Sequence, residues 1–367
     1  MPALKVSNTS VRILGFVCVV AMISGCSDDS EPAGNDRVAP DTGPLDVATG
    51  DVEQDAEAVS DVVDENEDTA EGSTPDAVID AGPRTYAGCF ADTLGRFEQV
   101  PDYDQYGPVI GSHCLGTNHQ DIVNVQKVVF FGDSVTVGTP PSFEEEYYRT
   151  ILSNRLRERF GESLVVESFA RFGARTDDLL LPSDEQLVRA FPEPEELRTL
   201  VVMTIGGNDL YRWIEMFNDG ASRDEISAKV DESIAQMRDA IEWLVEPGRF
   251  TNGVYVLFAN TYEFTDGTGD TLVCEIAPSI GLTEPWPQGQ EFVIRYNEAF
   301  LEIAVDTQTD MIFLQEEFCG HGFNAANPDA PCYRGPDTEV WFDFTCIHPN
   351  PAGHARMAEM FEALIAE

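Results

Sequence analysis

Short apolar segments alternate with helical segments from Val125 to the end of the chain, and this alternation constrains the fold more than any other feature. The apolar segments are rich in β-branched residues and bounded by Gly, Asn or Asp, as strands are, and they span residues 125–131, 164–169, 200–205, 254–259 and 311–314. Strands that alternate with helices favour right-handed crossovers and a parallel sheet covered on both faces. We therefore predict a three-layer α/β/α sandwich with a mainly parallel sheet of about five strands, in a domain that spans residues 85–367.

Two of the helical segments begin with a capping-box pattern, in which Ser and Glu stand three residues apart. The first pair is Ser142 with Glu145, and the second is Ser222 with Glu225. The last helix is predicted from Pro351 onward, because proline suits the first turn of a helix.

Residues 1–25 have the pattern of an export signal. A lysine and an arginine precede the apolar run from Ile13 to Ile23, which is too short to span a bilayer permanently. The run leads into Ile-Ser-Gly-Cys, which resembles the bacterial lipobox, whose cysteine is acylated and becomes the mature N-terminus. A plain secretory signal with an incidental cysteine is the alternative. Because Ser27 rather than Asp follows Cys26, we expect a lipid anchor in the bacterial cell envelope, at the outer membrane or cell surface rather than the inner membrane.

Residues 26–84 consist mainly of Asp, Glu, Ala, Gly, Pro and Val. Such a segment buries too little apolar surface to offset the entropy of ordering it, so we predict a disordered acidic tether anchored at Cys26. The formal net charge of the whole chain is -44. Binding to nucleic acid is therefore not expected, because phosphate contacts need clustered Lys and Arg.

Six of the eight cysteines lie beyond the signal and the predicted lipid site: Cys89, Cys114, Cys274, Cys319, Cys332 and Cys346. An even number in an exported chain favours disulfides, whereas a zinc site is the less favoured alternative because no CxxC pair is present. We expect Cys89 to pair with Cys114 and Cys319 to pair with Cys332.

The first predicted strand ends at Phe131 and is followed by Gly132, Asp133 and Ser134. A serine between the carboxyl end of a parallel strand and a helix exposes its hydroxyl at the edge where open α/β sheets bind ligands. That position suits a nucleophile. The three residues also favour ordinary turns, so a turn without catalytic function is the alternative.

Three later segments supply the other groups that a serine hydrolase needs. Gly173 offers a backbone N–H with no side chain in the way, Asn208 offers a carboxamide donor, and His348 offers a base. Together with Ser134, and in this order, they resemble the four residues that give the SGNH or GDSL hydrolase superfamily its name. The resemblance covers residues 125–367 and implies the flavodoxin-like fold of that superfamily.

The resemblance also implies a role for each residue. Ser134 would be the nucleophile, and His348 would remove its proton and later protonate the leaving group. The backbone N–H groups of Ser134 and Gly173 and the side-chain amide of Asn208 would form the oxyanion hole. Considered alone, Asn208 would be a turn residue and His348 a capping or packing residue.

The sequence departs from the superfamily where the third member of the triad is expected. The usual acid stands three residues before the histidine, where this chain has Thr345, and the nearest carboxylate is Asp343, five residues before it. We predict that Asp343 completes the triad, with Thr345 or a backbone carbonyl as the alternative partner of His348. Of the other histidines, His321 is a rival base, and His354 is expected to be structural.

The function that the resemblance implies is that of an exported serine esterase, which hydrolyses carboxylic esters through an acyl-enzyme without a metal or cofactor. Acyl lipids and O-acetylated polysaccharides both fit as substrates. An O-acyltransferase on the same scaffold is one alternative, and a non-catalytic lipoprotein that binds ligands at the cell surface is another. The expected partners are the ester substrate and, through the anchor, a membrane; we predict a monomer.

Overall fold

The computed structural model describes residues 84–96, 98–181 and 185–367. The predicted signal, the lipid site Cys26 and almost all of the predicted acidic tether lie outside these residues. Within the described part of the chain, no helix combines the length and the apolar character needed to cross a membrane.

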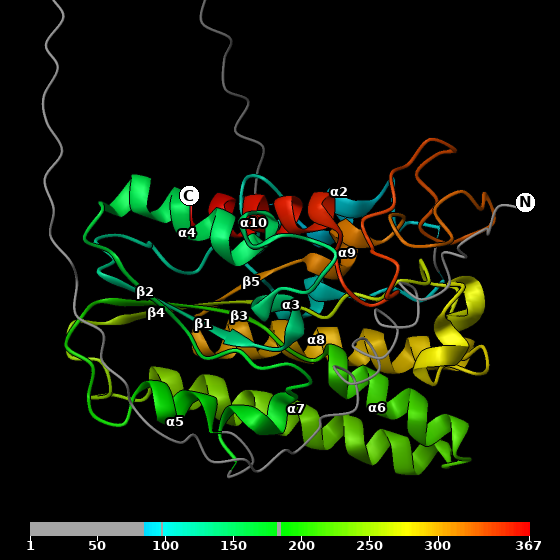
Figure 1. The fold of residues 1–367 in the computed structure, drawn as a ribbon, viewed down its shortest axis with the longest axis horizontal. Coiled ribbons are helices and arrows are strands. Elements are labelled where there is room, and N and C mark those ends of the chain that lie inside the picture. The colour runs from blue at the N-terminus through cyan, green and yellow to red at the C-terminus, as the bar shows by residue number, and fades with distance from the viewer. Residues whose placement is uncertain (1–83, 97, 182–184) are drawn as a thin grey trace, which may run out of the picture. The chain divides into compact units, whose positions relative to one another are not determined.

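Five strands form one parallel sheet (Figure 1). Their order in the sheet is β2-β1-β3-β4-β5, and all neighbouring strands are parallel. The strands are β1 (Lys127–Gly132), β2 (Val165–Ser168), β3 (Thr199–Thr204), β4 (Val254–Ala259) and β5 (Asp310–Ile312). Each lies within two residues of a predicted apolar segment, so the predicted α/β fold with a five-stranded sheet is confirmed.

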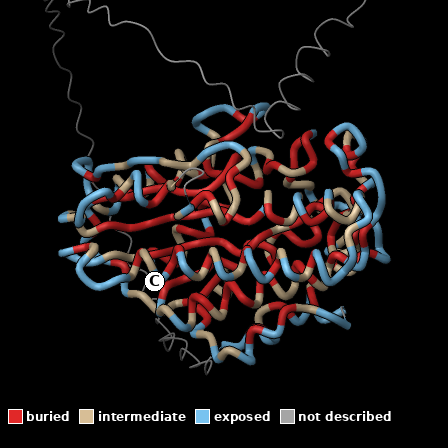
Figure 2. Tube along the Cα trace, turned by 90° about the horizontal axis from the view of Figure 1, so that it is seen from below, coloured by how far each residue is buried: buried red, intermediate tan, exposed pale blue. Residues whose placement is uncertain are grey.

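Helices cover both faces of the sheet. On one face α4 (Tyr148–Phe160) packs against α10 (Pro351–Ala366), and on the other α7 (Arg223–Val245) packs against α8 (Gln290–Thr307) (Figure 1). The central strands β1 and β3 are buried along their whole length. Figure 2 shows buried chain through the middle of the molecule and exposed chain at its periphery. The shorter helices are α2 (Tyr86–Phe90), α3 (Ser134–Val137), α5 (Gln186–Ala190), α6 (Gly207–Asn218) and α9 (Leu314–Phe318).

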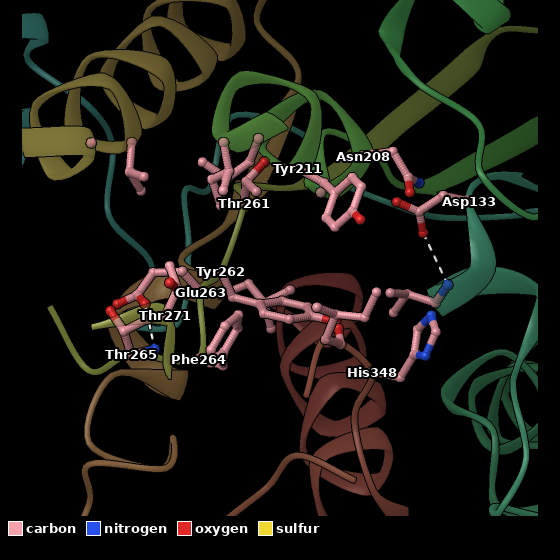
Figure 3. A pocket seen from close by; sticks show the side chains of 18 of the residues that line it. Asp133, Asn208, Tyr211, Thr261, Tyr262, Glu263, Phe264, Thr265, Thr271 and His348 are labelled. Carbon is pink, nitrogen blue, oxygen red and sulfur yellow. Dashed lines mark hydrogen bonds between the residues drawn. The ribbon is translucent and has the colours of Figure 1, made fainter. Parts of the chain in front are cut away.

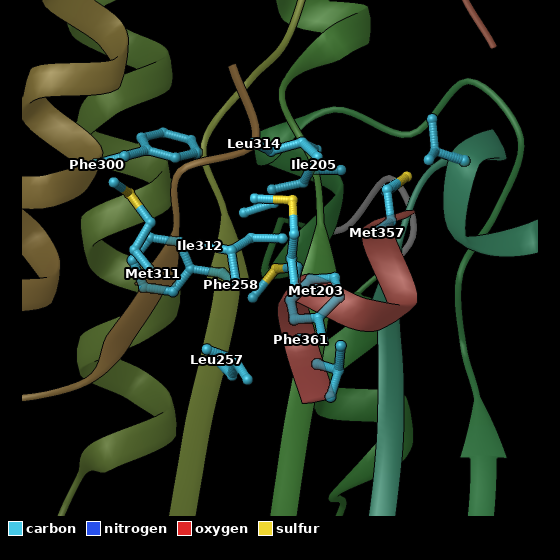
Figure 4. Close-up of a cluster of buried hydrophobic side chains, with 14 of the residues drawn as sticks. Met203, Ile205, Leu257, Phe258, Phe300, Met311, Ile312, Leu314, Met357 and Phe361 are labelled. Atoms are coloured by element: carbon cyan, nitrogen blue, oxygen red, sulfur yellow. The ribbon is translucent and has the colours of Figure 1, made fainter. Parts of the chain in front are cut away.

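Large apolar side chains fill both interfaces between the sheet and its helices. Phe258 of β4 contacts Phe300 of α8, with ring centroids 6.0 Å apart. On the opposite face, Phe130 of β1 contacts Tyr148 of α4, which stacks on Phe361 of α10. Figure 4 shows part of this core, with Phe258, Phe300 and Phe361 among the buried side chains. The burial of these aromatic rings holds the carboxyl ends of the strands, and hence the loops that follow them, in place.

The segment of residues 84–124 covers the free edge of β5. Gly116 forms an antiparallel bridge with Ile312, and the Thr117 N–H donates to Met311 O at 3.0 Å. A Cβ at Gly116 would lie 2.4 Å from Met311 O, so the close approach depends on glycine. The segment pairs backbone groups that an edge strand would otherwise leave open to other chains.

The helical segment predicted to begin at Ser142 begins differently in the structure. A 3-10 turn (Glu144–Glu146) intervenes, and α4 begins only at Tyr148. The hydroxyl of Ser142 is buried without a hydrogen-bond partner among the described residues, and the capping bond runs instead from the Phe143 N–H to Glu146 Oε2 at 2.7 Å. The predicted box is therefore wrong by one residue, whereas the second predicted box, at the start of α7, is confirmed.

Three disulfides are present in the described part of the chain. Two are the expected pairs, Cys89 with Cys114 and Cys319 with Cys332. The third joins Cys274 to Cys346 across 72 residues of sequence. It connects the segment that follows β4 to the loop that carries His348.

Candidate active site

Ser134 lies directly after β1, at the carboxyl edge of the sheet. Gly132 has a φ of +124°, and a Cβ there would lie 1.9 Å from Thr204 O, so the end of the strand requires glycine. Asp133 caps α3, because its Oδ1 accepts from the Val135 N–H at 2.9 Å. Ser134 therefore begins α3 and keeps only 9% of its surface exposed. Its side chain lines a pocket at this edge of the sheet.

His348 comes from the loop before α10, and its side chain meets that of Ser134. The Asp343 N–H donates to His348 O at 2.9 Å, which closes the loop on itself. Cys346 has a left-handed φ of +74°, and its disulfide to Cys274 fixes the turn from outside. In this arrangement Nε2 of His348 lies 2.9 Å from Oγ of Ser134, the separation of a serine–histidine hydrogen bond.

The other ring nitrogen of His348 contacts Thr345 rather than Asp343. Thr345 Oγ1 lies 2.9 Å from His348 Nδ1, and the same hydroxyl donates to Asp343 Oδ1 at 2.5 Å. Because a hydroxyl has one proton and that proton goes to the carboxylate, Thr345 is left to accept from Nδ1–H. The chain of hydrogen bonds therefore keeps the proton on Nδ1 and leaves Nε2 as the acceptor facing Ser134. Thr345 therefore lies between Asp343 and the ring, whereas the predicted triad has Asp343 bonded directly to the ring.

Burial sets the protonation of these groups. Removal of His348 from water lowers its pKa to about 4, so the ring is neutral at pH 7. Burial raises the pKa of Asp343 to about 6, against the lowering effect of the hydrogen bonds from Thr345. A neutral imidazole and an ionised carboxylate then coexist at neutral pH, which is the protonation state that a general base and its orienting group require.

Asn208 lies in the first turn of α6 and lines the same pocket as Ser134 and His348. Its Nδ2 donates to Ala174 O at 2.9 Å, which leaves a second amide proton for another acceptor. Gly173, the neighbour of Ala174, adopts a left-handed φ of +74° but is not among the residues that line the pocket. Three of the five predicted catalytic residues, Ser134, Asn208 and His348, thus line one pocket. Gly173 lies in the loop whose Ala174 accepts from Asn208, and Asp343 lies behind Thr345.

Asp209 is a buried residue of this site that the sequence analysis missed. Its carboxylate accepts from the N–H and the hydroxyl of Thr176, at 3.0 and 2.8 Å, and from the Ser233 hydroxyl at 2.8 Å. These bonds fasten the loop containing Gly173 to α6 and α7. The only signal for this role in the sequence is the position of Asp209 directly after Asn208. Burial raises the pKa of Asp209 to about 6, but a sequence does not show that burial.

Replacement of Asn208 by alanine is expected to lower kcat for a short p-nitrophenyl ester by about 10² to 10³, the usual cost of one lost oxyanion donor. Steady-state kinetics of the purified variant would measure the change. Asn252→Ala is the matched control, because Nδ2 of Asn252 makes the same kind of bond, to Glu196 O at 2.6 Å, at the opposite edge of the sheet. Equal losses in the two variants would contradict a catalytic role for Asn208.

The pocket has a volume of about 100 Å³ and extends away from the serine. His348, Asn208 and Asp133 lie at one end of it, and Glu263, Thr265 and Thr271 lie at the other (Figure 3). Most of the wall between the two ends is aromatic or aliphatic, including Tyr211, Ile214, Tyr262, Phe264, Leu282, Trp286 and Val293. The arrangement suits a substrate that presents its reacting group to the serine and an apolar group to the interior.

The other candidate histidines lie apart from Ser134. His321 stacks on Trp341 with ring centroids 3.4 Å apart, and its Nδ1 lies 2.7 Å from Glu339 O. His354 is fully buried beside Tyr148, and its role is structural as predicted. Neither lines the pocket, so the rival assignment of His321 as the base has no geometric support. Among the described residues, no three His, Cys, Asp or Glu side chains gather in a way that would hold a metal ion.

Comparison with known proteins gives one family match and several likenesses to solved structures. No curated protein matches the sequence. Phospholipase A1 from Streptomyces albidoflavus NA297 is 16% identical, with a TM-score of 0.44 over 65% of this chain and 98% of the phospholipase. An extracellular lipase from Streptomyces rimosus is 18% identical, with a TM-score of 0.40 over 65% and 99% of the two chains. Esterase EstA from Pseudoalteromonas sp. is 12% identical, with a TM-score of 0.40 over 66% and 97%.

The family match covers residues 130–356, which is more than half of the 367 residues. It begins inside β1, just before Ser134, and ends inside α10, just after His348. The matched region therefore contains all of the groups assembled above, and the chain belongs to the GDSL-like lipase/acylhydrolase family.

Proposed function

We propose that this protein is a serine esterase that hydrolyses carboxylic esters through an acyl-enzyme on Ser134. The observation that carries the proposal is the 2.9 Å contact between Ser134 Oγ and His348 Nε2 at the end of a mostly apolar pocket. Membership in a lipase/acylhydrolase family supports the same reaction class. The neutral state of His348 at pH 7, which follows from its lowered pKa, leaves Nε2 free to accept the serine proton.

In the first half of the reaction, Ser134 Oγ attacks the ester carbonyl carbon while its proton passes to His348 Nε2. The carbonyl oxygen becomes an oxyanion, and the proposed donors to it are the backbone N–H groups of Ser134 and Gly173 and the free amide proton of Asn208. His348 Nε2–H then protonates the leaving alkoxide oxygen as its bond to the carbonyl carbon breaks. The alcohol departs and the acyl group remains on Ser134.

The second half repeats these steps with water. His348 Nε2 removes a proton from a water molecule, and the water oxygen attacks the acyl carbon. The bond between the acyl carbon and Ser134 Oγ then breaks, and Ser134 Oγ takes the proton from His348, which releases the carboxylic acid. Throughout, Thr345 would hold the ring by accepting from Nδ1–H, and Asp343 would stabilise the imidazolium through the hydroxyl of Thr345. Asp343 thus acts as a positioning residue, in place of the directly bonded acid of the superfamily.

A fluorophosphonate probe and an ester substrate together test this function. The purified full-length protein is expected to hydrolyse p-nitrophenyl butanoate and to carry the probe on Ser134, as located by peptide mass spectrometry. Absence of turnover with every ester tried, together with labelling at another residue or at none, would overturn the proposal.

We also propose that the protein is anchored by lipid at Cys26. The support is the lipobox-like sequence at residues 23–26 and the acidic stretch that follows it, which would separate the catalytic domain from the membrane. Mass spectrometry of the membrane fraction is expected to find a diacylglyceryl group on Cys26, and Cys26→Ser is expected to move the protein to the soluble fraction. Cys18→Ser, in the preceding apolar run, is the control and should not change the fractionation. Recovery of the unsubstituted protein only as a soluble, unacylated species would contradict the anchor.

A further inference from the structure

The segment between β4 and α8 supplies most of the pocket wall that lies away from Ser134. The wall residues from this segment are Asn260, Thr261, Tyr262, Glu263, Phe264, Thr265, Gly269, Thr271, Leu282, Trp286 and Gly289. The disulfide from Cys274 to Cys346 ties the segment to the loop of His348. The catalytic base and the far wall of the pocket are therefore joined covalently, as expected if both contact one substrate.

The polar groups of this wall already have partners within the protein. The Tyr262 hydroxyl donates to Ile347 O at 2.9 Å, and the Thr271 hydroxyl donates to Glu284 O at 2.7 Å. The Tyr211 hydroxyl donates to Ile280 O in the same way. Because these hydroxyls are already committed, they offer little to a polar substrate group at this end of the pocket.

The buried carboxylate on this wall is also satisfied. Glu263 is 6% exposed, and its two oxygens accept from the N–H groups of Thr265 and Gly267, at 2.5 and 2.7 Å. A sugar hydroxyl or a charged group that entered here would have to lose its hydration or break these bonds. An apolar chain has no hydrogen bonds with water to give up and would not disturb these bonds, since the remaining lining is aromatic and aliphatic.

Trp286 lines the pocket and is held firmly by its own segment. Its backbone N–H donates to Gly269 O at 2.7 Å. Its ring stacks on Phe217 with centroids 5.4 Å apart, and a Cβ at Gly289 would lie 2.3 Å from it, so the ring is held tightly from two sides. Trp286 and Leu282 are only 5% and 1% exposed, so this part of the wall is buried.

The size of the pocket sets an upper limit on the group that it holds. An apolar cavity of about 150 Å³ binds benzene, so a pocket of about 100 Å³ holds an apolar group of roughly four to six carbons. The ester carbonyl takes up the end next to Ser134. An acetyl group would leave most of the pocket empty, and a palmitoyl chain would exceed it.

We propose, on the basis of the esterase function above, that this pocket binds the acyl part of the ester and selects apolar acyl chains of about four to six carbons. Esters of short- to medium-chain fatty acids are the substrate class, in preference to O-acetyl groups and to long-chain lipids. Trp286 and Val293, which both line the pocket, determine the chain length.

The test is the acyl-chain profile of the full-length protein with p-nitrophenyl acetate, butanoate, hexanoate, octanoate and palmitate. From acetate upward, kcat/KM is expected to rise about fourfold per methylene, the equivalent of 0.8 kcal/mol for each buried methylene group, and to fall once the pocket is full. Trp286→Ala is expected to move the maximum to longer chains, and Val293→Phe to shorter ones. Each profile is expressed as the ratio of kcat/KM for each ester to kcat/KM for acetate with the same variant, so that only the position of the maximum is compared.

Trp243→Ala is the matched control. This half-buried tryptophan of α7 packs against Arg249, which follows the helix, and it does not line the pocket. Its profile should match that of the unsubstituted protein. A maximum at acetate, or a profile that neither Trp286→Ala nor Val293→Phe shifts, would overturn the acyl-pocket proposal even if the probe labels Ser134. Absence of any turnover and of labelling would instead overturn the esterase function itself. If Trp286→Ala does not fold, Val293→Phe alone decides.

Discussion

Replacement of Ser134 by alanine is expected to lower kcat for p-nitrophenyl butanoate by about 10⁶, the loss typical of a serine nucleophile removed from a complete site. Without Oγ there is no acyl-enzyme, and the remaining rate would come from substrate binding and the oxyanion donors alone. The hydrogen bond that the Ser134 hydroxyl makes in the structure is to His348. The variant should therefore unfold thermally at about the temperature of the unsubstituted protein.

A matched serine serves as the control for this substitution. Ser142 is also buried, lies in the next loop, and has a hydroxyl without a hydrogen-bond partner among the described residues. Ser142→Ala should keep full activity and full fluorophosphonate labelling. Retention of activity by Ser134→Ala, or probe labelling at a residue other than Ser134, would show that the nucleophile has been assigned wrongly.

The parallel sheet could be predicted because its strands are short, continuous apolar runs with clear polar boundaries. β1 and β3 are buried on both faces, and this burial requires the unbroken apolar pattern that the sequence shows. The segment of residues 84–124 could not be placed in the same way. It reaches the edge of β5 through one bridge, Gly116 to Ile312, and its disulfide, Cys89 to Cys114, is internal to the segment. Neither leaves a periodic pattern in the sequence.

The candidate site was predictable only as far as its residues follow strands. Ser134 and Asn208 come directly after β1 and β3, so the topology brings them to one edge. The pocket itself was not predictable, because its far wall comes from a long segment of short turns whose path depends on the disulfide of Cys274. Asp343 was assigned by its charge and nearness in sequence, and a sequence does not show that a threonine lies between it and the ring.

That threonine changes the expected effect of substitutions in the triad. Thr345→Val keeps the shape of the side chain but removes the oxygen that accepts from His348 Nδ1–H. The ring then loses the partner that fixes its tautomer, and kcat/KM is expected to fall by about 10² to 10⁴. Thr345→Ser, which restores the oxygen, should recover most of the activity. Near-normal activity in Thr345→Val would rule out the hydrogen-bond chain.

Asp343→Asn is expected to have a smaller effect than Thr345→Val, because the amide oxygen can still accept from the Thr345 hydroxyl. What the variant loses is the charge, and a hydrogen bond to a charged group exceeds a neutral one by about 1 to 2 kcal/mol, or roughly 5- to 30-fold. Thermal unfolding at pH 7 should not be impaired. Burial raises the pKa of Asp343 from 3.8 to about 6, so its contribution to stability is lost as pH rises through this range, and a side chain that does not ionise avoids the loss.

The pH profile separates the proposed electrostatic role of Asp343 from a purely structural one. Below a pH of about 6, the pKa of Asp343, the carboxylate takes up a proton and ceases to stabilise the imidazolium. The kcat/KM of the unsubstituted protein should therefore fall below this pH, while Asp343→Asn should stay level until His348, with a pKa of about 4, is protonated. The two proteins should converge in activity near pH 5. A ratio between them that stays constant from pH 5 to pH 8 would mean that Asp343 supports only the shape of the loop, and that Thr345 alone orients His348.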